Sequence, residues 1–439
     1  MAFVDLDIWL NGEHLGVWFW TRTGISGLRY TDAWMRSPNA RPLSLSLPIT
    51  SGNGEVLGAK VEHYFDNLLP DSNVIRERLR RRFAAPSARA ADLLAAIGRD
   101  CVGAVQLVPS GTAPPAHTQM DSTALSDAQI ETMLNDVSSD APNDKSPARD
   151  FRISIAGAQE KTALLRVGQR WHVPHGATPT THIFKLPLGV VGNMQADMSD
   201  SVENEWLCSK ILAQLGFDVA QSDIGQFGQQ KALVIERFDR RLMDGGRWIA
   251  RLPQEDFCQA TGTPGDLKYE SDGGPGMLAG LALLSGSANA KADSLRFVMA
   301  QLAFWLLAAT DGHAKNFSIF IERGGNYRLT PLYDVLSAWP VIGRGRNQIA
   351  PQRAKLAMAV RGKSPHYRLQ EIRPRHWQAL ALRTGAPDAF EHLVALVLQV
   401  PHALDAVAQQ LPLSFPPRVF KTIQTGMTAQ AQRFMDQLP

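Results

Sequence analysis

Cysteine is scarce in this chain of 439 residues. Only three are present, Cys101, Cys208 and Cys258, and their wide spacing matches neither a metal-binding motif nor a disulfide framework. An odd, sparse set of thiols is typical of proteins in a reducing compartment. We therefore expect the thiols to stay reduced and the protein to work in the cytoplasm.

Long apolar runs are also missing. The longest, at 297–309, is interrupted by Gln301 and is too short to span a bilayer. The N-terminal letters M-A-F-V-D-L-D include acidic residues where a secretory signal would have basic ones. These features predict a chain without a membrane partner.

A strong excess of charge of one sign is absent, because the formal net charge is only +3. Global charge therefore does not predict a nucleic-acid partner. Two local basic clusters stand out: one holds Arg76, Arg78, Arg80, Arg81 and Arg82, and the other holds Arg373, Arg375 and His376. Each cluster alone is typical of solvated surface. The chain has no DNA-recognition motif, so we expect no base readout by it.

What is present is an ordinary globular composition, with 44% hydrophobic and 20% charged residues. The length suggests about two to three domains. Residues 1–108 predict a small α/β domain. In it, Asn11-Gly12 lies between alternating runs and predicts a hairpin, residues 62–82 predict a helix, and residues 102–108 predict a closing strand.

Residues 109–150 are rich in Pro, Ser, Ala and Asp and predict a linker with one short helix at 126–137, capped by Ser126. One larger core is predicted over 151–439, β-rich to 239 and mostly helical from 240. Its expected strands and helix are a strand-turn-strand at 153–167, strands at 171–174, 181–187 and 231–238, and a helix at 202–215. This order predicts an α/β (α+β) fold with two lobes and a cleft between them.

The letters A-T-D-G-H-A-K-N follow a long apolar helix for which Asp293 is the expected N-cap. The interval from Asp311 to Asn316 is that of the protein-kinase loop H-R-D-x-x-x-x-N. Asp311 is expected to orient a substrate hydroxyl. Asn316 and Asp334, the latter in P-L-Y-D-V, offer the hard oxygens that Mg²⁺ prefers. The alternative is a helix-ending turn, since Asp-Gly is common in turns.

A phosphate-covering loop is expected at 154–162, S-I-A-G-A-Q-E-K-T. Ala156, Gly157 and Ala158 are small enough to let the backbone approach an anion. With a single glycine in the segment, an ordinary hairpin is the alternative.

Lys185 stands inside the apolar strand T-H-I-F-K-L-P, where a lysine is unusual without a partner. It is a candidate for neutralising nucleotide phosphates, and Glu203 or Glu205 is a candidate for orienting it; the choice between the two stays open. The alternative is an edge lysine that reaches water.

The segment V-I-E-R-F-D is an apolar strand that turns polar. Main-chain groups of Glu236 and Phe238 are expected to bond an adenine edge, and Asp239 to reach the ribose. The alternative is a strand that ends in surface charges.

These motifs together resemble the HipA-type serine/threonine kinase toxins of bacterial toxin–antitoxin pairs. The resemblance runs along nearly the whole chain, through F-D-N-L-L-P-D-S, A-A-I-G-R-D-C-V-G-A, S-I-A-G-A-Q-E-K-T-A-L, T-H-I-F-K-L-P, E-R-F-D-R-R, L-P-Q-E-D, Y-E-S-D-G-G-P-G, A-T-D-G-H-A-K-N and P-L-Y-D-V. It implies a kinase-like fold related to lipid kinases, with ATP and Mg²⁺ as cofactors.

The resemblance also implies roles for single residues. Asp311 is the implied catalytic residue and Ser154 the implied autophosphorylation site, where added charge would repel ATP and silence the enzyme. The implied nucleotide-binding residues are Ala156, Gly157, Ala158, Gln159, Glu160, Lys161, Lys185, Glu236, Arg237, Phe238, His313, Ala314, Lys315, Asn316, Tyr333 and Asp334.

The implied partner is a HipB-like helix-turn-helix antitoxin dimer bound to operator DNA. In that complex this chain is a candidate for contacts with the DNA backbone. The resemblance further implies a protein substrate such as glutamyl-tRNA synthetase. Phosphorylation of that substrate would cause growth arrest and persistence. Two other function classes fit the same motifs. One is a small-molecule phosphotransferase of the same architecture, and the other is a catalytically silent corepressor.

Overall fold

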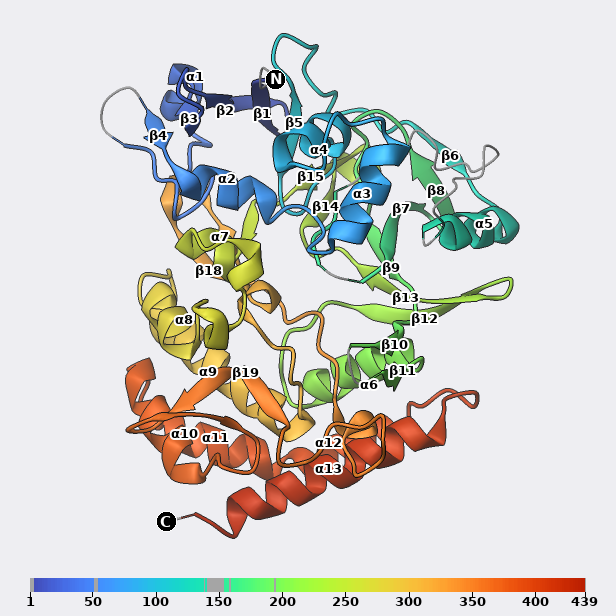
Figure 1. Cartoon of the computed structure of the whole chain (residues 1–439), viewed down its shortest axis with the longest axis vertical. Helices are drawn as coiled ribbons and strands as arrows, with labels where there is room; N and C mark the ends of the chain where they lie inside the picture. Colours follow the sequence, from blue (N-terminus) through green and yellow to red (C-terminus); the bar gives the residue numbers. More distant parts are fainter. Residues whose placement is uncertain are drawn as a thin grey trace. The chain divides into compact units, whose positions relative to one another are not determined.

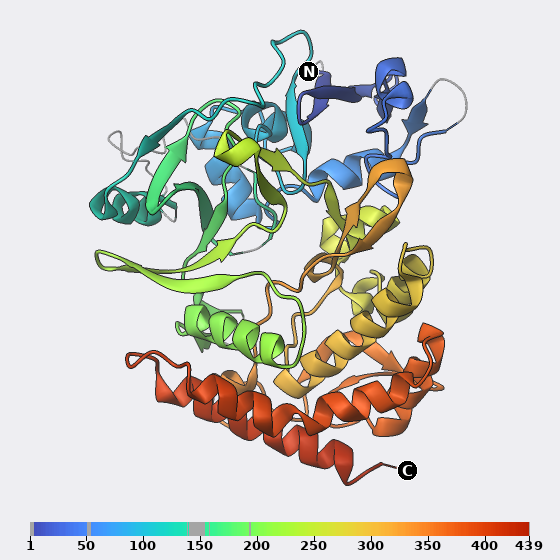
Figure 2. The same ribbon diagram turned by 180° about the vertical axis from the view of Figure 1, so that it is seen from behind.

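The computed structural model describes residues 4–50, 54–137, 139, 154–157, 159–192 and 195–438. The chain divides into two compact units (Figures 1 and 2). Unit 1 consists of Met1–Leu186, Gly225–Asp266 and Ser318–Tyr327. Unit 2 consists of Pro187–Ile224, Leu267–Phe317 and Arg328–Pro439.

Unit 1 begins with a five-stranded antiparallel sheet in the order β4-β3-β2-β1-β5. Its strands are β1 (Leu6–Leu10), β2 (Glu13–Trp20), β3 (Ser26–Tyr30), β4 (Glu55–Leu57) and β5 (Val105–Pro109). Its helices are α1 (Asp32–Arg36), α2 (Ala59–Asp66), α3 (Asn73–Arg82) and α4 (Ala90–Ile97). Asn11 and Gly12 join β1 to β2, so the predicted hairpin is confirmed. Their φ angles of 46° and 86° are those of a type I′ turn.

The helix predicted over 62–82 is wrong as a single element. It is split into α2 and α3, and the break contains Pro70. Proline lacks an N–H and disfavours a helical residue before it, which ends a helix at this point. Ser72 then starts α3, because its side chain accepts a hydrogen bond from the Ile75 N–H.

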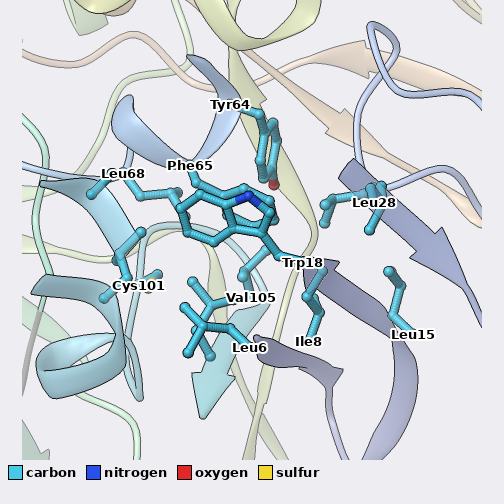
Figure 3. Close-up of a cluster of buried hydrophobic side chains, with 14 of the residues drawn as sticks. Leu6, Ile8, Leu15, Trp18, Leu28, Tyr64, Phe65, Leu68, Cys101 and Val105 are labelled. Atoms are coloured by element: carbon cyan, nitrogen blue, oxygen red, sulfur yellow. The ribbon is translucent and has the colours of Figure 1, made fainter. Parts of the chain in front are cut away.

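A hydrophobic core holds the sheet to the helices (Figure 3). Trp18 of β2 lies over the ring of Phe65 of α2, with ring centroids 4.1 Å apart, and both side chains are at most 1% exposed. Leu6, Ile8 and Leu28 fill the space around them. Burial of large aromatic side chains of this kind contributes several kcal/mol, on the order of 3–5 for each replacement by alanine.

A six-stranded sheet follows in the order β12-β13-β9-β7-β8-β6. Its strands are β6 (Ser122–Ala124), β7 (Lys161–Val167), β8 (Arg170–Pro174), β9 (His182–Lys185), β12 (Ser222–Phe227, which begins in unit 2) and β13 (Gln230–Glu236). Helix α5 (Asp127–Val137) lies beside this sheet (Figure 1) and buries Ile130, Met133 and Leu134 in a common core with Phe184.

The predictions for this region are largely confirmed. Ser126 caps α5, because its side chain accepts a hydrogen bond from the Gln129 N–H. Strands β8, β9 and β13 agree with the strands predicted at 171–174, 181–187 and 231–238. The prediction of two strands within 153–167 is wrong for the first of them. Residues 154–157 form no strand and have only an isolated bridge at Gly157. Ile153 and the linker end 140–150 lie outside the described residues.

The remaining elements of unit 1 are small. They are β14 (Arg240–Met243), η1 (Asp244–Gly246), β15 (Trp248–Arg251), β16 (Gln254–Asp256), α7 (Phe257–Thr261), η2 (Gly265–Leu267, which ends in unit 2), β17 (Ser318–Ile321), η5 (Arg323–Gly325) and β18 (Tyr327–Leu329, which also ends in unit 2).

Unit 2 is mainly helical. Its helices are α6 (Ser201–Gln214), α8 (Met277–Leu284), α9 (Ala290–Leu307), α10 (Pro374–Ala381), α11 (Ala389–Leu398), α12 (Val400–Ala408) and α13 (Pro417–Met435), with short turns η3 (Glu270–Asp272), η4 (Ala314–Asn316), η6 (Trp339–Val341) and η7 (Leu382–Thr384). Two strand pairs complete it: β10 (Gly189–Val191) with β11 (Ala196–Met198), and β19 (Lys355–Arg361) with β20 (Pro365–Arg368). In both ribbon views the long α13 lies against α12.

The predicted apolar helix before residue 311 is α9, and it is buried along most of its length. The expectation that Asp293 caps it is wrong. Asn289 precedes the helix, and Asp293 lies in its first turn, where it accepts a hydrogen bond from the Ser287 hydroxyl at 2.7 Å. The predicted 202–215 helix is confirmed as α6.

No single helix of the described residues is long and apolar enough to cross a membrane. Helices α11 and α12, which meet at a bend of 41°, reach the required length and composition only as a pair.

The buried carboxyl of Glu255 in β16 makes the stability of unit 1 depend on pH. Its side chain is fully buried, and Oε1 accepts from the Leu45 N–H at 2.9 Å, whereas Oε2 has no hydrogen-bond partner among the described residues. Burial raises the pKa of Glu255 from 4.5 to about 8. The unfolded chain therefore ionises first, and this group costs stability as the pH rises from 4.5 to about 8.

We expect Glu255→Gln to remove this pH dependence. The amide keeps an acceptor for the Leu45 N–H but cannot ionise, so its stability relative to the wild type should grow as the pH is raised from 5 to 8. Thermal unfolding at several pH values measures the difference. A constant difference across that range would mean that Glu255 does not titrate in it.

Candidate active site

The loop after α9 is anchored by backbone hydrogen bonds. The Ala309 N–H donates to the Phe304 carbonyl at 2.8 Å, and the His313 N–H donates to the Asp311 carbonyl at 2.8 Å. Gly312 passes so close to the Phe304 ring that an added Cβ would lie 2.5 Å from Cδ2. The Asp-Gly pair is therefore a fixed turn on a buried helix, which holds the following side chains in place.

Asn316 and Asp334 lie together in unit 2. The Asn316 amide accepts from the His313 N–H at 3.1 Å through Oδ1 and donates to Asp334 Oδ2 at 3.2 Å through Nδ2. Asp334 has φ of +60°, a left-handed conformation that is unusual outside glycine. Strain of this kind persists where surrounding contacts hold it, and it is often found at functional sites.

Asp311 is exposed. It accepts a hydrogen bond from Tyr269, a residue for which the sequence motifs predicted no role. The Tyr269 hydroxyl donates to Asp311 Oδ1 at 2.5 Å, and its ring packs edge-on against His313 with centroids 5.0 Å apart. Tyr269 lies 42 residues before Asp311, so no local spacing links the two. The Tyr333 hydroxyl in turn donates to the Lys315 carbonyl at 2.8 Å. Ala314 is fully buried, and its N–H bonds the Lys268 carbonyl at 3.3 Å.

The donor set here suits a magnesium ion that arrives with a phosphate ligand. Asp334 and Asn316 supply two oxygen-bearing side chains, and the described part of the chain contains no cluster of three or more His, Cys, Asp or Glu. Mg²⁺ is commonly held by one or two carboxylates plus water and substrate phosphates rather than by a full protein cage. The residues present therefore fit such an ion.

In unit 1, two lysines lie directly opposite each other on neighbouring strands. Lys161 of β7 pairs with Lys185 of β9, so both side chains leave the same face of the sheet. Lys185 is 6% exposed, and the Lys161 ammonium donates to the Ala156 carbonyl at 2.7 Å. Two positively charged side chains on one face of the sheet would favour an anion bound on that face.

The predicted phosphate loop has a tight turn at Gly157. Its φ is +107°, a backbone conformation that favours glycine, and the end of the Lys161 side chain lies close to it. Beyond the turn, the Leu186 N–H donates to the Glu160 carbonyl at 3.2 Å, and the Gln159 amide donates to the Leu186 carbonyl. Ala158 lies outside the described residues.

Ser154, at the start of this loop, is fully buried. Its hydroxyl donates to the Leu68 carbonyl at 2.7 Å, and its N–H donates to the Asp100 carbonyl at 3.2 Å. A phosphoryl group cannot reach the hydroxyl in this position. Modification of Ser154 therefore needs a conformation in which these bonds are broken.

At the end of β13, the N–H and C=O groups of successive residues point alternately toward β9 and away from it. The Arg237 N–H donates to the Thr181 carbonyl at 2.8 Å, so the main-chain groups of Glu236 and Phe238 face away from β9. Contact of these groups with an adenine stays a prediction. The Glu236 side chain is exposed, and Phe238 packs edge-on against Phe320.

The expectation that Asp239 reaches a ribose does not agree with the structure. Its carboxylate is 3% exposed and accepts from the Arg237 guanidinium at 2.9 Å and from the Gly103 N–H at 2.7 Å. Arg237, assigned to the nucleotide by resemblance, has its side chain in the same buried cluster. Both side chains therefore hold the strand in place, and only main-chain groups at 236–238 remain candidates for contact with adenine.

The two candidate partners of Lys185, Glu203 and Glu205, are both in α6 of unit 2, and both are buried. Which of them orients Lys185 stays open. The meeting of Lys185 with Asp311, Asn316 and Asp334 around one nucleotide likewise stays a prediction.

Both basic clusters contain side chains that form ion pairs or hydrogen bonds within the chain. Arg76 bonds Asp66 at 2.6 Å, Arg80 bonds Glu77 at 2.7 Å, and Arg373 donates to the Gln437 side chain at 2.7 Å. Arg76 and Arg78 are only 13% and 15% exposed, and His376 is 5% exposed, so the expectation of solvated surface is wrong for these three side chains.

Comparison with known families shows two matches in order along the chain. The HipA N-terminal domain matches residues 6–108, and the HipA-like C-terminal domain matches residues 153–407. The chain is 32% identical over 397 residues to the Sinorhizobium fredii protein Y4mE, provisionally named a kinase; the match covers 87% of this chain and 86% of that protein. It is 28% identical over 326 residues, 71% of this chain and 69% of the relative, to the serine/threonine-protein kinase toxin HipA of Shewanella oneidensis.

The fold has a solved counterpart. HipA of Shewanella oneidensis MR-1, in a complex with HipB and its operator DNA, matches 98% of this chain and 97% of its own length with a TM-score of 0.79 at 24% sequence identity. The predicted α/β fold class is confirmed by this likeness.

Proposed function

The chain belongs to the HipA family, and from this premise we propose that it is an ATP- and Mg²⁺-dependent serine/threonine-protein kinase that acts as the toxin of a toxin–antitoxin pair. The names of its relatives support kinase chemistry in general. The observation that carries the specific proposal is the hydrogen bond from Asn316, which lies on the same short, anchored loop as Asp311, to the carboxylate of Asp334.

The proposed reaction uses each of these groups. A substrate hydroxyl oxygen bonds to the γ-phosphorus of ATP, the bond from that phosphorus to the β,γ-bridging oxygen breaks, and ADP leaves. Asp311 orients the hydroxyl and accepts its proton. Mg²⁺ bound at Asn316 and Asp334 would neutralise charge on the phosphates. Lys161 and Lys185 add positive charge for the nucleotide, and main-chain groups at 236–238 fix its base.

Incubation with γ-labelled ATP and a bacterial lysate tests this proposal. A protein kinase transfers label to protein bands, including its own Ser154. Label only in small molecules would favour a small-molecule phosphotransferase. ATP binding without any transfer would favour the silent corepressor.

We further propose the cytoplasm as the site of action and an HipB-like antitoxin dimer, bound to operator DNA, as the partner. The solved relative is in a complex with both, and the three thiols are buried and form no disulfide. Growth arrest would follow from phosphorylation of a translation component such as glutamyl-tRNA synthetase. Phosphoproteomics of cells that express the wild type or an Asp311 variant identifies the target, and co-purification with the neighbouring antitoxin tests the partner.

Autophosphorylation at Ser154 is expected to switch the enzyme off, and Ser154→Asp should imitate it. The new carboxylate would face the Leu68 carbonyl oxygen in a fully buried position and would repel both that oxygen and the ATP phosphates. We expect ATP affinity to fall at least about tenfold, since desolvating an unpaired charge displaces the loop. Calorimetric titration measures it, with Ser154→Ala as the uncharged control. An aspartate variant that binds ATP as tightly as the alanine variant would reject the charge switch.

A further inference from the structure

Five charged side chains form a buried ion network in unit 1. Asp100 accepts from Arg237 at 3.3 Å, from Arg240 at 2.9 Å and from Arg251 at 3.2 Å. Asp239 accepts from Arg237 at 2.9 Å and from Arg240 at 3.0 Å. Each side chain is at most 4% exposed. Burial alone would raise the pKa of Asp100, but the three arginines bring it well below its usual value, so the group stays charged.

The network joins the first part of the chain to the strand expected to bind adenine. Asp100 lies in the turn between α4 and β5, whereas Arg237, Asp239 and Arg240 directly follow β13. The same turn adds backbone contacts: the Cys101 carbonyl accepts from Arg237 at 2.9 Å, and the Gly103 N–H donates to Asp239 at 2.7 Å. The end of β13 is therefore fixed from the side of residues 99–103.

Asp100 also reaches the phosphate loop, through its main chain. Its carbonyl accepts from the Ser154 N–H at 3.2 Å. One residue thus contacts both segments, with its carboxylate on the adenine strand and its carbonyl on the first described residue of the loop.

The segment between α2 and α3 holds the same loop at further points. The Leu68 carbonyl accepts the Ser154 hydroxyl at 2.7 Å, Pro70 forms a β-bridge with Gly157, and the Asp71 N–H donates to the Gly157 carbonyl at 3.2 Å. Apart from that bridge, the described loop residues before β7 lie in no strand or helix. The conformation of this loop therefore depends on its contacts with residues 68–71 and with Asp100.

A gain in stability does not by itself account for such a network. A buried ion pair is often no more stable than well-packed apolar side chains of the same volume, because desolvation offsets the attraction. What charges provide at this place is fixed geometry, since each guanidinium is held in a fork of directional bonds. Fixed geometry is what two segments that must meet one nucleotide require.

We propose that residues 68–71 and 99–103 act as a clamp on the nucleotide site, with Asp100 as the positioning residue that couples the phosphate loop to the adenine-binding strand. The proposal rests on the proposed function for the identity of the ligand. Asp100 acts through the Arg237 guanidinium and the Ser154 N–H and does not touch the nucleotide itself.

Asp100→Asn is the direct test, since it removes the charge and keeps the shape. We expect ATP affinity to fall about tenfold, because small displacements of positioning groups have effects of this size. Without nucleotide, hydrogen–deuterium exchange should become faster at both 154–157 and 236–239. Thr180→Val is the milder variant: it removes a hydroxyl that donates to Asp100 at 2.7 Å and accepts from Arg237 at 2.9 Å. The same changes are expected at smaller size.

Leu28→Ala is the matched control, because Leu28 is a fully buried core residue of β3 with no part in the network. At temperatures well below unfolding, it should lower stability and leave ATP affinity and exchange at both segments unchanged. Wild-type exchange and affinity in Asp100→Asn and Thr180→Val would overturn the clamp, as would equal changes in Leu28→Ala. A wild-type protein that binds no ATP would refute the proposed function instead, and the exchange measurement would still decide the clamp.

Discussion

Asp311→Asn should reduce phosphoryl transfer to protein by about 10²–10⁴-fold, the range that a general base contributes. The amide cannot accept the proton of the substrate hydroxyl. Asp311 is exposed, and its carboxylate accepts a hydrogen bond from the Tyr269 hydroxyl, which an amide oxygen can also accept. ATP binding and unfolding temperature should therefore change little. Initial rates of label transfer from ATP, measured beside ATP affinity, give both quantities.

Asp272→Asn is the control for this prediction. Asp272 is another exposed carboxylate of unit 2, with a hydrogen bond from the Ser271 hydroxyl at 3.2 Å. It should retain wild-type transfer. If the Asp311 variant autophosphorylated at the wild-type rate, Asp311 would lose its assigned role, and another base would have to be found.

Arg237→Met should lower the stability of unit 1 by about 3–5 kcal/mol, the usual cost of removing one partner from a buried ion pair. Asp239 would retain only Arg240 among its arginine partners in the network, and Asp100 would lose one of three. Urea unfolding at neutral pH measures the loss. Arg241→Met is the control, since Arg241 is an exposed neighbour and its replacement should cost far less.

The same variant should show a characteristic pH dependence. In the wild type, burial opposes ionisation of Asp239, but Arg237 and Arg240 lower its pKa, so its contribution is present above the unfolded pKa near 3.8 and is lost only as the pH falls below it. Without Arg237 the carboxylates can take up protons at higher pH. The deficit of the variant should therefore shrink from pH 7 to pH 5. An equal deficit at both values would point to lost packing rather than lost charge.

Local signals explain what could be predicted from the sequence. Asn11-Gly12 needs only its own backbone preference to form a hairpin, and Ser126 needs only the neighbouring Gln129 to cap α5. The same kind of signal was available in Pro70, which divides the helix predicted over 62–82. Asp293 was misplaced because a polar residue in the first turn can bond a distant partner as readily as cap the helix.

The remaining features depend on contacts between distant parts of the chain. Tyr269 reaches Asp311 across 42 residues, and Asp100 reaches Arg240 across 140. Periodicity and motif spacing describe only neighbours in sequence, so Asp239 was assigned to a ribose when its carboxylate lies among arginines. Asp311 and Asn316 lie on one short loop, and Asn316 bonds the His313 N–H and Asp334. Their roles in catalysis and metal binding stay predictions.

The position of Asp100 sets a limit on how this protein can be divided. The two family matches stop at residue 108 and resume at residue 153, which invites expression of the second part alone. A chain truncated there would leave Arg237, Arg240 and Arg251 with one carboxylate among them, in a region that water would then enter. The part that begins at residue 153 is accordingly not a portable module. Swapping it between homologues should succeed only when the matching first hundred residues are transferred with it.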